Sequence, residues 1–171
     1  WCYSSSSSQV SPMKLSKNLS LLEVTKSNTA KRLGIDNTPD EWATANLKEI
    51  AENVFQPLRE AFKCPIYVSS GYRSAELNTA IGGSVRSQHV EGRALDLDAD
   101  VFGRCKNGDI FRWILNNVTF DQLIWEFGNE DNPDWVHVSY VHDGVNRGRC
   151  LKACRDDQGK TYYEVIFGKG L

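Results

Sequence analysis

The sequence contains no long apolar run, no cluster of one charge and few histidines. Among its 171 residues, 20 Lys and Arg stand against 22 Asp and Glu, for a formal net charge of −2. Because nucleic-acid binding needs a basic face, nucleic acid is not expected as a partner, and neither is an anionic membrane surface. No apolar run approaches the ~20 residues of a membrane-spanning helix. The composition, 40% hydrophobic and 25% charged, indicates a soluble globular protein of one domain.

The five cysteines are odd in number and irregularly spaced, which does not indicate a disulfide framework. Cys64 directly precedes the apolar run 65–68, so we expect a buried free thiol there. Cys150 and Cys154 are separated by a gap of the kind that structural zinc sites use. No further Cys or His lies close enough in sequence to complete such a site, and the role of this pair stays open. A reduced protein in the cytoplasm is therefore expected.

Residues 1–12 differ in composition from the rest of the chain. They begin with Trp1 and continue through a run of five serines. This segment is neither basic nor apolar enough for a secretory signal. We interpret it as a disordered leader or a vector-derived remnant, with Met13 as a candidate natural start and residues 13–171 as a single domain.

Helical patterns dominate the first half of the chain. Residues 20–34 mix apolar and basic residues at helical spacing. A longer helix is predicted to begin at Thr38, with Thr38 as N-cap, Pro39 in the first turn and Glu41 three residues after the cap. Pro57 is expected to kink or break it. The apolar stripe of this helix consists of Leu47, Ile50, Ala51, Val54, Leu58, Ala61 and Phe62.

Strand patterns dominate the second half, with only two shorter helices, predicted at 75–81 and 109–116. Because helices come first and antiparallel strands dominate later, we expect an α+β fold, with N-terminal helices packed on a mainly antiparallel sheet. The last two strands are predicted to form a hairpin. The predicted strands are 66–68, 94–98, 120–127, 135–141, 151–155 and 161–166.

Two histidines and one aspartate lie where a metal site can form. Gly92 allows a tight turn between His89 and the strand that carries Asp96. Asp96 stands between two leucines, so its buried charge needs a strong partner. His137 lies in the middle of another strand. Two imidazoles and one carboxylate make a tetrahedral zinc site with the fourth position left for water, which is the arrangement of catalytic zinc.

Taken singly, each of these residues has a simpler interpretation. A histidine in a strand is more often a hydrogen-bonded core residue than a metal ligand. Asp96 could instead form a buried salt bridge with Arg93 or Arg73. The combination of a His-x6-Asp spacing across a glycine turn with a second strand histidine is more specific than any one member.

This combination resembles the zinc D-alanyl-D-alanine carboxypeptidase family, which includes phage endolysins that cut peptidoglycan stem peptides and shares its fold with the hedgehog signalling domain. The resemblance covers roughly residues 20–140. It implies that His89, Asp96 and His137 bind zinc and that Arg73 binds a substrate carboxylate or carbonyl oxygen, which suits a guanidinium. The matching motifs are Ser87-x-His89-x-x-Gly92-x-Ala94-x-Asp96, Trp135-x-His137-x-Ser139 and Ser69-Ser70-Gly71-Tyr72-Arg73-Ser74.

Two acidic residues are candidates for the general base. In many relatives an acidic residue stands three positions before the last ligand histidine, here Asp134, and in another pattern a glutamate lies on the preceding strand, here Glu126. If these two strands pair as a hairpin, Glu126 faces Trp135 and lies ~7 Å diagonally from His137 on the same sheet face. Asp134 has the opposite parity. We favour Glu126, although a one-residue slip in register would reverse this choice.

The resemblance implies a zinc metallopeptidase that hydrolyses bonds adjoining D-amino acids in peptidoglycan stem peptides, either as a D,D-carboxypeptidase or as an L-alanyl-D-glutamate endolysin. Gln88 and Tyr140 are expected to line the cleft and bind substrate, and His142 to be an exposed loop residue. We expect a monomer, whose cytoplasmic location fits a phage-encoded enzyme that acts on the cell wall after release. The alternatives are a non-catalytic zinc-binding module of hedgehog-like fold and a structural phage protein.

Overall fold

The computed structural model describes residues 13–166, so the interpretation of residues 1–12 lies outside the described part of the chain. At its centre is a six-stranded sheet in the order β3-β4-β6-β5-β7-β8. Neighbouring strands are antiparallel except β5 and β7, which run parallel. The strands are β3 (Tyr67–Ser70), β4 (Ala94–Asp98), β5 (Gln122–Glu126), β6 (Trp135–Ser139), β7 (Arg149–Arg155) and β8 (Thr161–Val165). The predicted α+β fold is confirmed.

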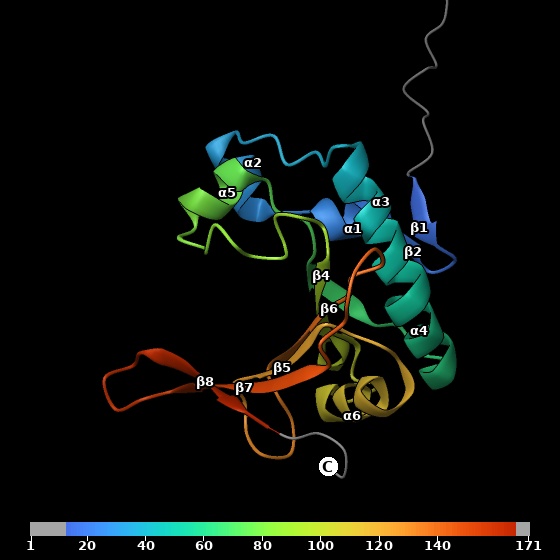
Figure 1. The fold of residues 1–171 in the computed structure, drawn as a ribbon, viewed down its shortest axis with the longest axis vertical. Coiled ribbons are helices and arrows are strands. Elements are labelled where there is room, and N and C mark those ends of the chain that lie inside the picture. The colour runs from blue at the N-terminus through green and yellow to red at the C-terminus, as the bar shows by residue number, and fades with distance from the viewer. Residues whose placement is uncertain (1–12, 167–171) are drawn as a thin grey trace, which may run out of the picture.

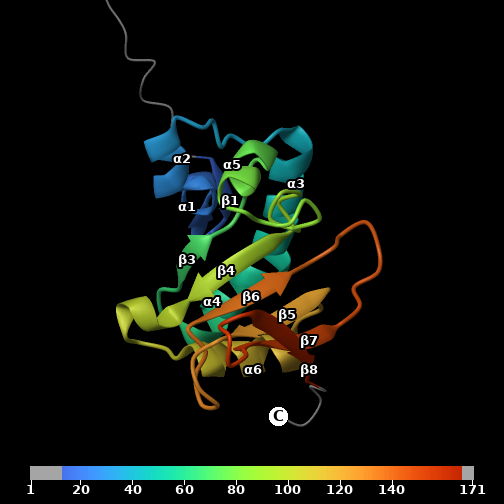
Figure 2. The ribbon, with the colours of Figure 1, turned by 90° about the vertical axis from the view of Figure 1, so that its left-hand side faces the viewer.

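The helices lie behind the sheet and at its β3 end, which leaves one sheet face open (Figures 1 and 2). A rod of α3, a π-helical turn and α4 lies behind the strands in Figure 2, as does α6, while α1, α2 and α5 lie near β3. A short hairpin of β1 and β2, which was not predicted, precedes α1. The bounds are β1 (Lys14–Ser16), β2 (Leu19–Ser20), α1 (Leu21–Thr25), α2 (Asn28–Leu33), α3 (Glu41–Ile50), the π turn (Ala51–Phe55), α4 (Gln56–Phe62), α5 (Ala75–Ala80), the 3₁₀ helix η3 (Ala99–Phe102) and α6 (Asn107–Asn117).

Alternation along the central strands separates the two faces of the sheet. Leu95 and Leu97 on β4 and Val136 on β6 are fully buried and belong to one apolar cluster with residues of α4 and α6. Because successive side chains of a strand point to opposite faces, Asp96 and His137 point away from the helices. The sequence pattern that builds the core therefore also places these two polar side chains on the open face.

The start of α3 differs from the prediction, because Asp40 and not Thr38 is its N-cap. The Asp40 carboxylate accepts a hydrogen bond from the N–H of Ala43 at 2.7 Å, while the Thr38 hydroxyl donates to Asp36. Pro57 stands in the first turn of α4, directly after the π turn. Since proline has no N–H to donate to the preceding turn, the widened π turn accommodates the break predicted at this position.

A disulfide joins Cys64 and Cys105, so the prediction of a free thiol at Cys64 is wrong. The bond links the segment before β3 to the loop between η3 and α6, across 41 residues of sequence. It is at odds with the expected reduced cytoplasmic protein, because disulfides persist mainly in oxidising compartments. No helix within residues 13–166 is long and apolar enough to cross a membrane.

Candidate active site

His89 lies in a tight turn directly before β4. The turn contains Gly92, whose φ of +75° is rarely adopted by L side chains, and a Cβ there would meet the Ala43 carbonyl oxygen at 2.6 Å. The Ser87 hydroxyl accepts a hydrogen bond from the His89 N–H at 3.3 Å. His89 Nδ1 lies 2.7 Å from the Gly71 carbonyl oxygen. Because a carbonyl can only accept, Nδ1 carries the proton and Nε2 presents its lone pair to the cleft.

Three donor atoms converge on the open face of the sheet. His137 Nδ1 lies 3.0 Å from Asp96 Oδ1, and His89 Nε2 lies 3.2 Å from His137 Nδ1 and 3.4 Å from Asp96 Oδ1. Within residues 13–166 this is the only group of three or more His, Cys, Asp or Glu side chains that is placed to hold a metal. In a tetrahedral zinc site with bonds of about 2.0–2.1 Å, neighbouring ligand atoms are about 3.3 Å apart. The three residues therefore fit a metal ion with one coordination position left open.

The Asp96 carboxylate is stabilised in its charged form. Burial on its own would raise the pKa of Asp96, but its interactions with His89 and His137 outweigh this effect and hold the pKa well below its ordinary value. The two histidines therefore favour the ionised form of Asp96, which is the form that binds a metal.

Glu126 lies next to this cluster on β5. Glu126 pairs with Trp135 and Ile124 pairs with His137, so the register predicted for these two strands is confirmed. Glu126 is only 7% exposed. Burial raises the pKa of Glu126 to about 7, with an opposing influence from His137 and a reinforcing one from Asp96. A carboxyl group with this pKa can both accept and donate a proton near neutral pH.

Arg73 lies on the other side of the cluster. Its Nη2 atom is 4.0 Å from Asp96 Oδ2, and its backbone N–H donates to the His89 carbonyl oxygen at 3.1 Å. The buried Nε atom of Arg73 has no hydrogen-bond partner in the described part of the chain. A guanidinium with unused donors beside a metal site is well placed to bind a carbonyl oxygen or carboxylate of a ligand.

A cleft of about 650 Å³ contains the metal cluster, Glu126 and Arg73. One wall is the loop that follows α5, with Arg86 and Gln88 among its lining residues. The opposite wall is the β7–β8 hairpin, which extends away from the body of the protein on the left of Figure 1. The metal cluster, Glu126 and Arg73 thus lie in the middle of an open groove, between the loop after α5 and the β7–β8 hairpin.

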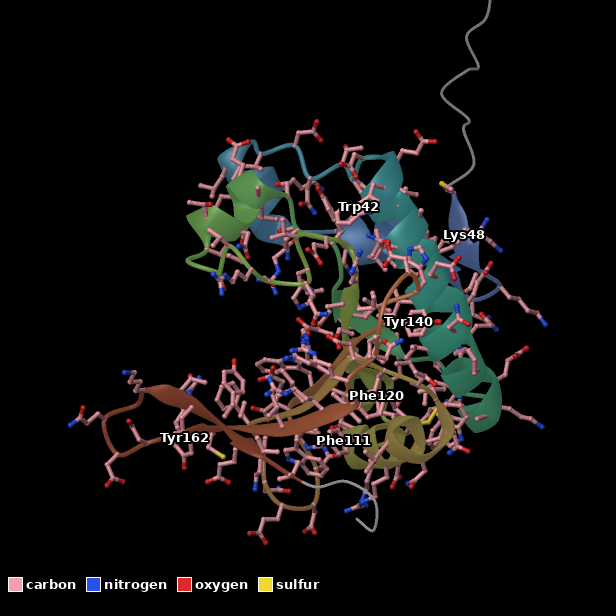
Figure 3. The ribbon with its side chains drawn as sticks, in the orientation of Figure 1. Trp42, Lys48, Phe111, Phe120, Tyr140 and Tyr162 are labelled. Carbon is pink, nitrogen blue, oxygen red and sulfur yellow. A yellow bond between two sulfur atoms is a disulfide. The ribbon has the colours of Figure 1, made fainter. Side chains whose placement is uncertain are left out.

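Besides Arg73, two residues were predicted to contact substrate, and they differ in position. Gln88 lies in the cleft, where its Nε2 donates to Asp121 Oδ2 at 2.8 Å. Tyr140 lies outside the cleft, so the prediction that it lines the cleft is wrong. It borders a different hollow together with Asn53 and Trp113, near the helices (Figure 3). Because Tyr140 is three positions after His137, it has the parity of the core face.

Asp134 is also outside the cleft. It is exposed and borders a separate hollow together with Asn129 and Lys152. Its backbone N–H donates to the Glu126 carbonyl oxygen at 2.9 Å, which fixes it at the end of the turn, directly before β6. His142 is exposed, as predicted, and its Nε2 lies 2.8 Å from Asn46 Oδ1.

Cys150 and Cys154 are free and belong to β7. Cys150 is part of the apolar core, and burial raises the pKa of its thiol to about 11. Cys154 is partly buried, and its Sγ lies 3.9 Å from the Lys152 carbonyl oxygen. The cluster of His89, Asp96 and His137 includes neither cysteine.

The cleft also contains residues that the sequence did not single out, above all Leu151, Thr161 and Tyr163 of the hairpin. Their shared parity within the predicted hairpin indicated that they lie on one face. Which face that is depends on the parallel pairing of β7 with β5, for which the sequence carries no local signal.

Two histidines and a carboxylate around an open position, with a buried acid beside them, are the arrangement that metal-dependent hydrolases use. A family model described as Peptidase M15 matches residues 17–139, and the chain belongs to this family of peptidases. The resemblance noted in the sequence is thereby confirmed. No match was found among curated proteins. The matched stretch contains the metal cluster, Arg73 and Glu126, and it ends before β7.

Proposed function

We propose that this protein is a zinc peptidase that hydrolyses bonds next to D-amino acids in peptidoglycan stem peptides. The observation that carries the proposal is the convergence of His89 Nε2, His137 Nδ1 and Asp96 Oδ1 within 3.4 Å of one another, in a chain of the M15 peptidase family. Two imidazole nitrogens and one carboxylate oxygen with an open position are a donor set of catalytic zinc.

Bound zinc would polarise the scissile carbonyl group and lower the pKa of a coordinated water to about 7. In the proposed reaction Glu126 accepts a proton from the water that attacks the carbonyl carbon. It then donates this proton to the amine nitrogen that leaves. In the metal-free protein burial raises the pKa of Glu126 to about 7, and a carboxyl group buried beside the metal site is suited to both steps. Arg73 would bind the carbonyl oxygen while negative charge develops on it.

The geometry favours Glu126 over Asp134 as the general base. Glu126 and His137 lie on the same face as diagonal neighbours and border the same cleft. Asp134 borders a different hollow. The Cys64–Cys105 disulfide supports a site of action outside the reducing cytosol, where peptidoglycan is found.

The test is cleavage of purified peptidoglycan by the zinc-loaded protein, followed by mass spectrometry of the released D-Ala or stem-peptide fragments. Glu126→Gln should lower kcat about 10²- to 10⁴-fold while the zinc content per chain stays the same. Asp134→Asn is the matched control and should retain activity within about twofold.

Each alternative has a distinct outcome. If Asp134→Asn is inactive and Glu126→Gln is active, Asp134 is the base. If the wild-type protein binds zinc but releases no fragment from peptidoglycan or from synthetic stem peptides, the protein is a non-catalytic zinc-binding module. The length of the fragments separates a carboxypeptidase, which releases single D-Ala residues, from an endopeptidase.

A further inference from the structure

The β7–β8 hairpin presents one of its two faces to the cleft. Leu151 pairs with Ile124 on β5 and with Val165 on β8, so these three side chains share the open face of the sheet. By the same alternation, Thr161 and Tyr163 lie on that face, and both border the cleft. The open face of the sheet, which carries the metal cluster, therefore continues onto the hairpin, and the hairpin forms one wall of the cleft.

Tyr163 is the hairpin side chain best placed to contact a ligand at the metal cluster. Ala153 lies between Tyr163 and Glu126 in one row across β8, β7 and β5. Because alanine has only a methyl group, the phenol ring has room above it in the direction of Glu126. Burial raises the pKa of Tyr163, and the negative charges of Glu126 and Asp96 raise it further, which places the phenol within the electrostatic range of the site.

The two walls of the cleft differ in chemistry. The wall beside α5 carries Arg73 and Arg86, whereas the hairpin wall carries Leu151, Thr161 and Tyr163. A ligand with an acidic group toward the arginines and an extended peptide segment toward the hairpin matches both. A tyrosine suits the second role because its ring packs on apolar groups while its hydroxyl bonds peptide amides.

We propose that the hairpin face formed by Leu151, Thr161 and Tyr163 binds the peptide segment that leaves the scissile bond on the side opposite to the α5 wall with Arg86. This proposal rests on the peptidase function proposed above and adds a substrate class, namely peptides that extend beyond the two residues joined by the bond. The family match ends at residue 139, so this wall lies outside the matched stretch. It gives this chain a means of selecting long peptides that is separate from the catalytic residues.

The neighbouring tyrosine provides a matched control. Tyr162 is 42% exposed and Tyr163 is 55% exposed, yet Tyr162 has the opposite parity and pairs with Cys154. Figure 3 shows Tyr162 on the side of the hairpin turned away from α5. Loss of Tyr162 thus removes the same ring from the same strand without touching the cleft.

The experiment compares Tyr163→Ala with Tyr162→Ala in the zinc-loaded protein, using synthetic stem peptides from a dipeptide to a pentapeptide. Tyr163→Ala should raise KM for the pentapeptide about tenfold while kcat changes less than about twofold. The effect should shrink as the peptide becomes shorter. Tyr162→Ala should leave both constants within about twofold of the wild type.

Binding of the uncleaved pentapeptide separates this proposal from the peptidase function. In the Glu126→Gln protein, isothermal titration calorimetry should show about tenfold weaker binding when Tyr163→Ala is added. Equal KM and Kd with and without Tyr163, in a protein that cleaves or binds the peptides, would overturn the hairpin proposal and leave the peptidase function standing. A fall in kcat with unchanged KM would make Tyr163 part of the catalytic step instead. If the wild-type protein neither cleaves nor binds any of the peptides, both proposals fail.

Discussion

The central strands β4, β6 and β5 and the outer hairpin β7–β8 contribute to one face of the sheet, but they expose their side chains to different degrees. Asp96 and Glu126 are 8% and 7% exposed, whereas every residue of β8 is exposed. Where water is excluded, neighbouring polar groups act strongly on one another, and the pKa values of Asp96 and Glu126 are shifted in opposite directions. The side chains of β8 remain accessible to a ligand. One sheet thus combines a buried reactive centre with an exposed binding wall.

The largest effect is expected at the metal cluster. Asp96→Ala removes a ligand and leaves His89 and His137 without their common carboxylate. Activity should fall about 10³-fold or more, and the zinc content measured after dialysis should fall with it. His142→Ala is the control, because His142 is exposed and outside the cluster. Full zinc content in the Asp96→Ala protein would show that the metal site lies elsewhere.

The next effect concerns stability and depends on pH. The pKa of Glu126 is raised from 4.5 to about 7 in the folded, metal-free protein. Because the folded state holds this proton more tightly than the unfolded chain, the associated stability is present below about pH 4.5 and is lost as the pH rises to about 7. Metal-free Glu126→Gln should therefore be more stable than the wild type by about 3 kcal/mol at about pH 8, with no difference near about pH 4.

Urea denaturation in the presence of a chelator measures the free energies of unfolding of the variant and of the wild type at each of the two pH values. A difference between variant and wild type that is the same at both pH values would mean that Glu126 titrates as an ordinary exposed carboxyl group. The centre of the sheet would then be as accessible to water as the hairpin is.

A smaller effect is expected at the turn that holds His89. In Gly92→Ala the φ of +75° and the contact with the Ala43 carbonyl oxygen both oppose the new methyl group. The free energy of unfolding should fall by about 2 kcal/mol, and zinc affinity should fall because His89 moves. Gly34→Ala is the control: its φ is +68° but no atom lies within 4 Å of the added carbon, so about 1 kcal/mol is expected. Equal losses would show that the Ala43 contact is relieved without cost.

The smallest effect is expected on the hairpin. Because Tyr163 is exposed, Tyr163→Ala should change the free energy of unfolding by about 0.5 kcal/mol or less. Denaturation curves of the variant and the wild type should nearly coincide. A loss of several kcal/mol would mean that β8 is part of the folded core, and its contrast with the central strands would disappear.

The centre of the sheet could be predicted from the sequence because strand alternation is a local signal. The leucines around Asp96 and the valines around His137 determine which face is buried. Once β5 and β6 are paired across the turn before Trp135, Glu126 necessarily lies on the same sheet face as His137. Tyr140 was assigned wrongly although the same alternation, counted from His137, places it on the core face.

The remaining features depend on contacts between distant parts of the chain. The Cys64–Cys105 disulfide joins residues whose sequence spacing carries no sign of their proximity. The parallel pairing of β7 with β5 brings Tyr163 of β8 into the cleft, and it requires the chain to pass from β6 across the end of β5 before β7 begins. Asp40 replaced Thr38 as N-cap because the hydroxyl of Thr38 bonds to Asp36 instead.

By pairing with β5, strand β7 also covers what would otherwise be an edge rich in apolar residues. Leu123, Ile124 and Trp125 are all at most 7% exposed, and β7 occupies the side of β5 that faces away from β6. An open strand of this kind acts as a template for pairing with another chain. A fragment that ends at Ser139 would keep the entire metal cluster and still expose this edge, and we expect it to self-associate. We therefore expect β7 to limit aggregation of the protein, whatever the cleft binds.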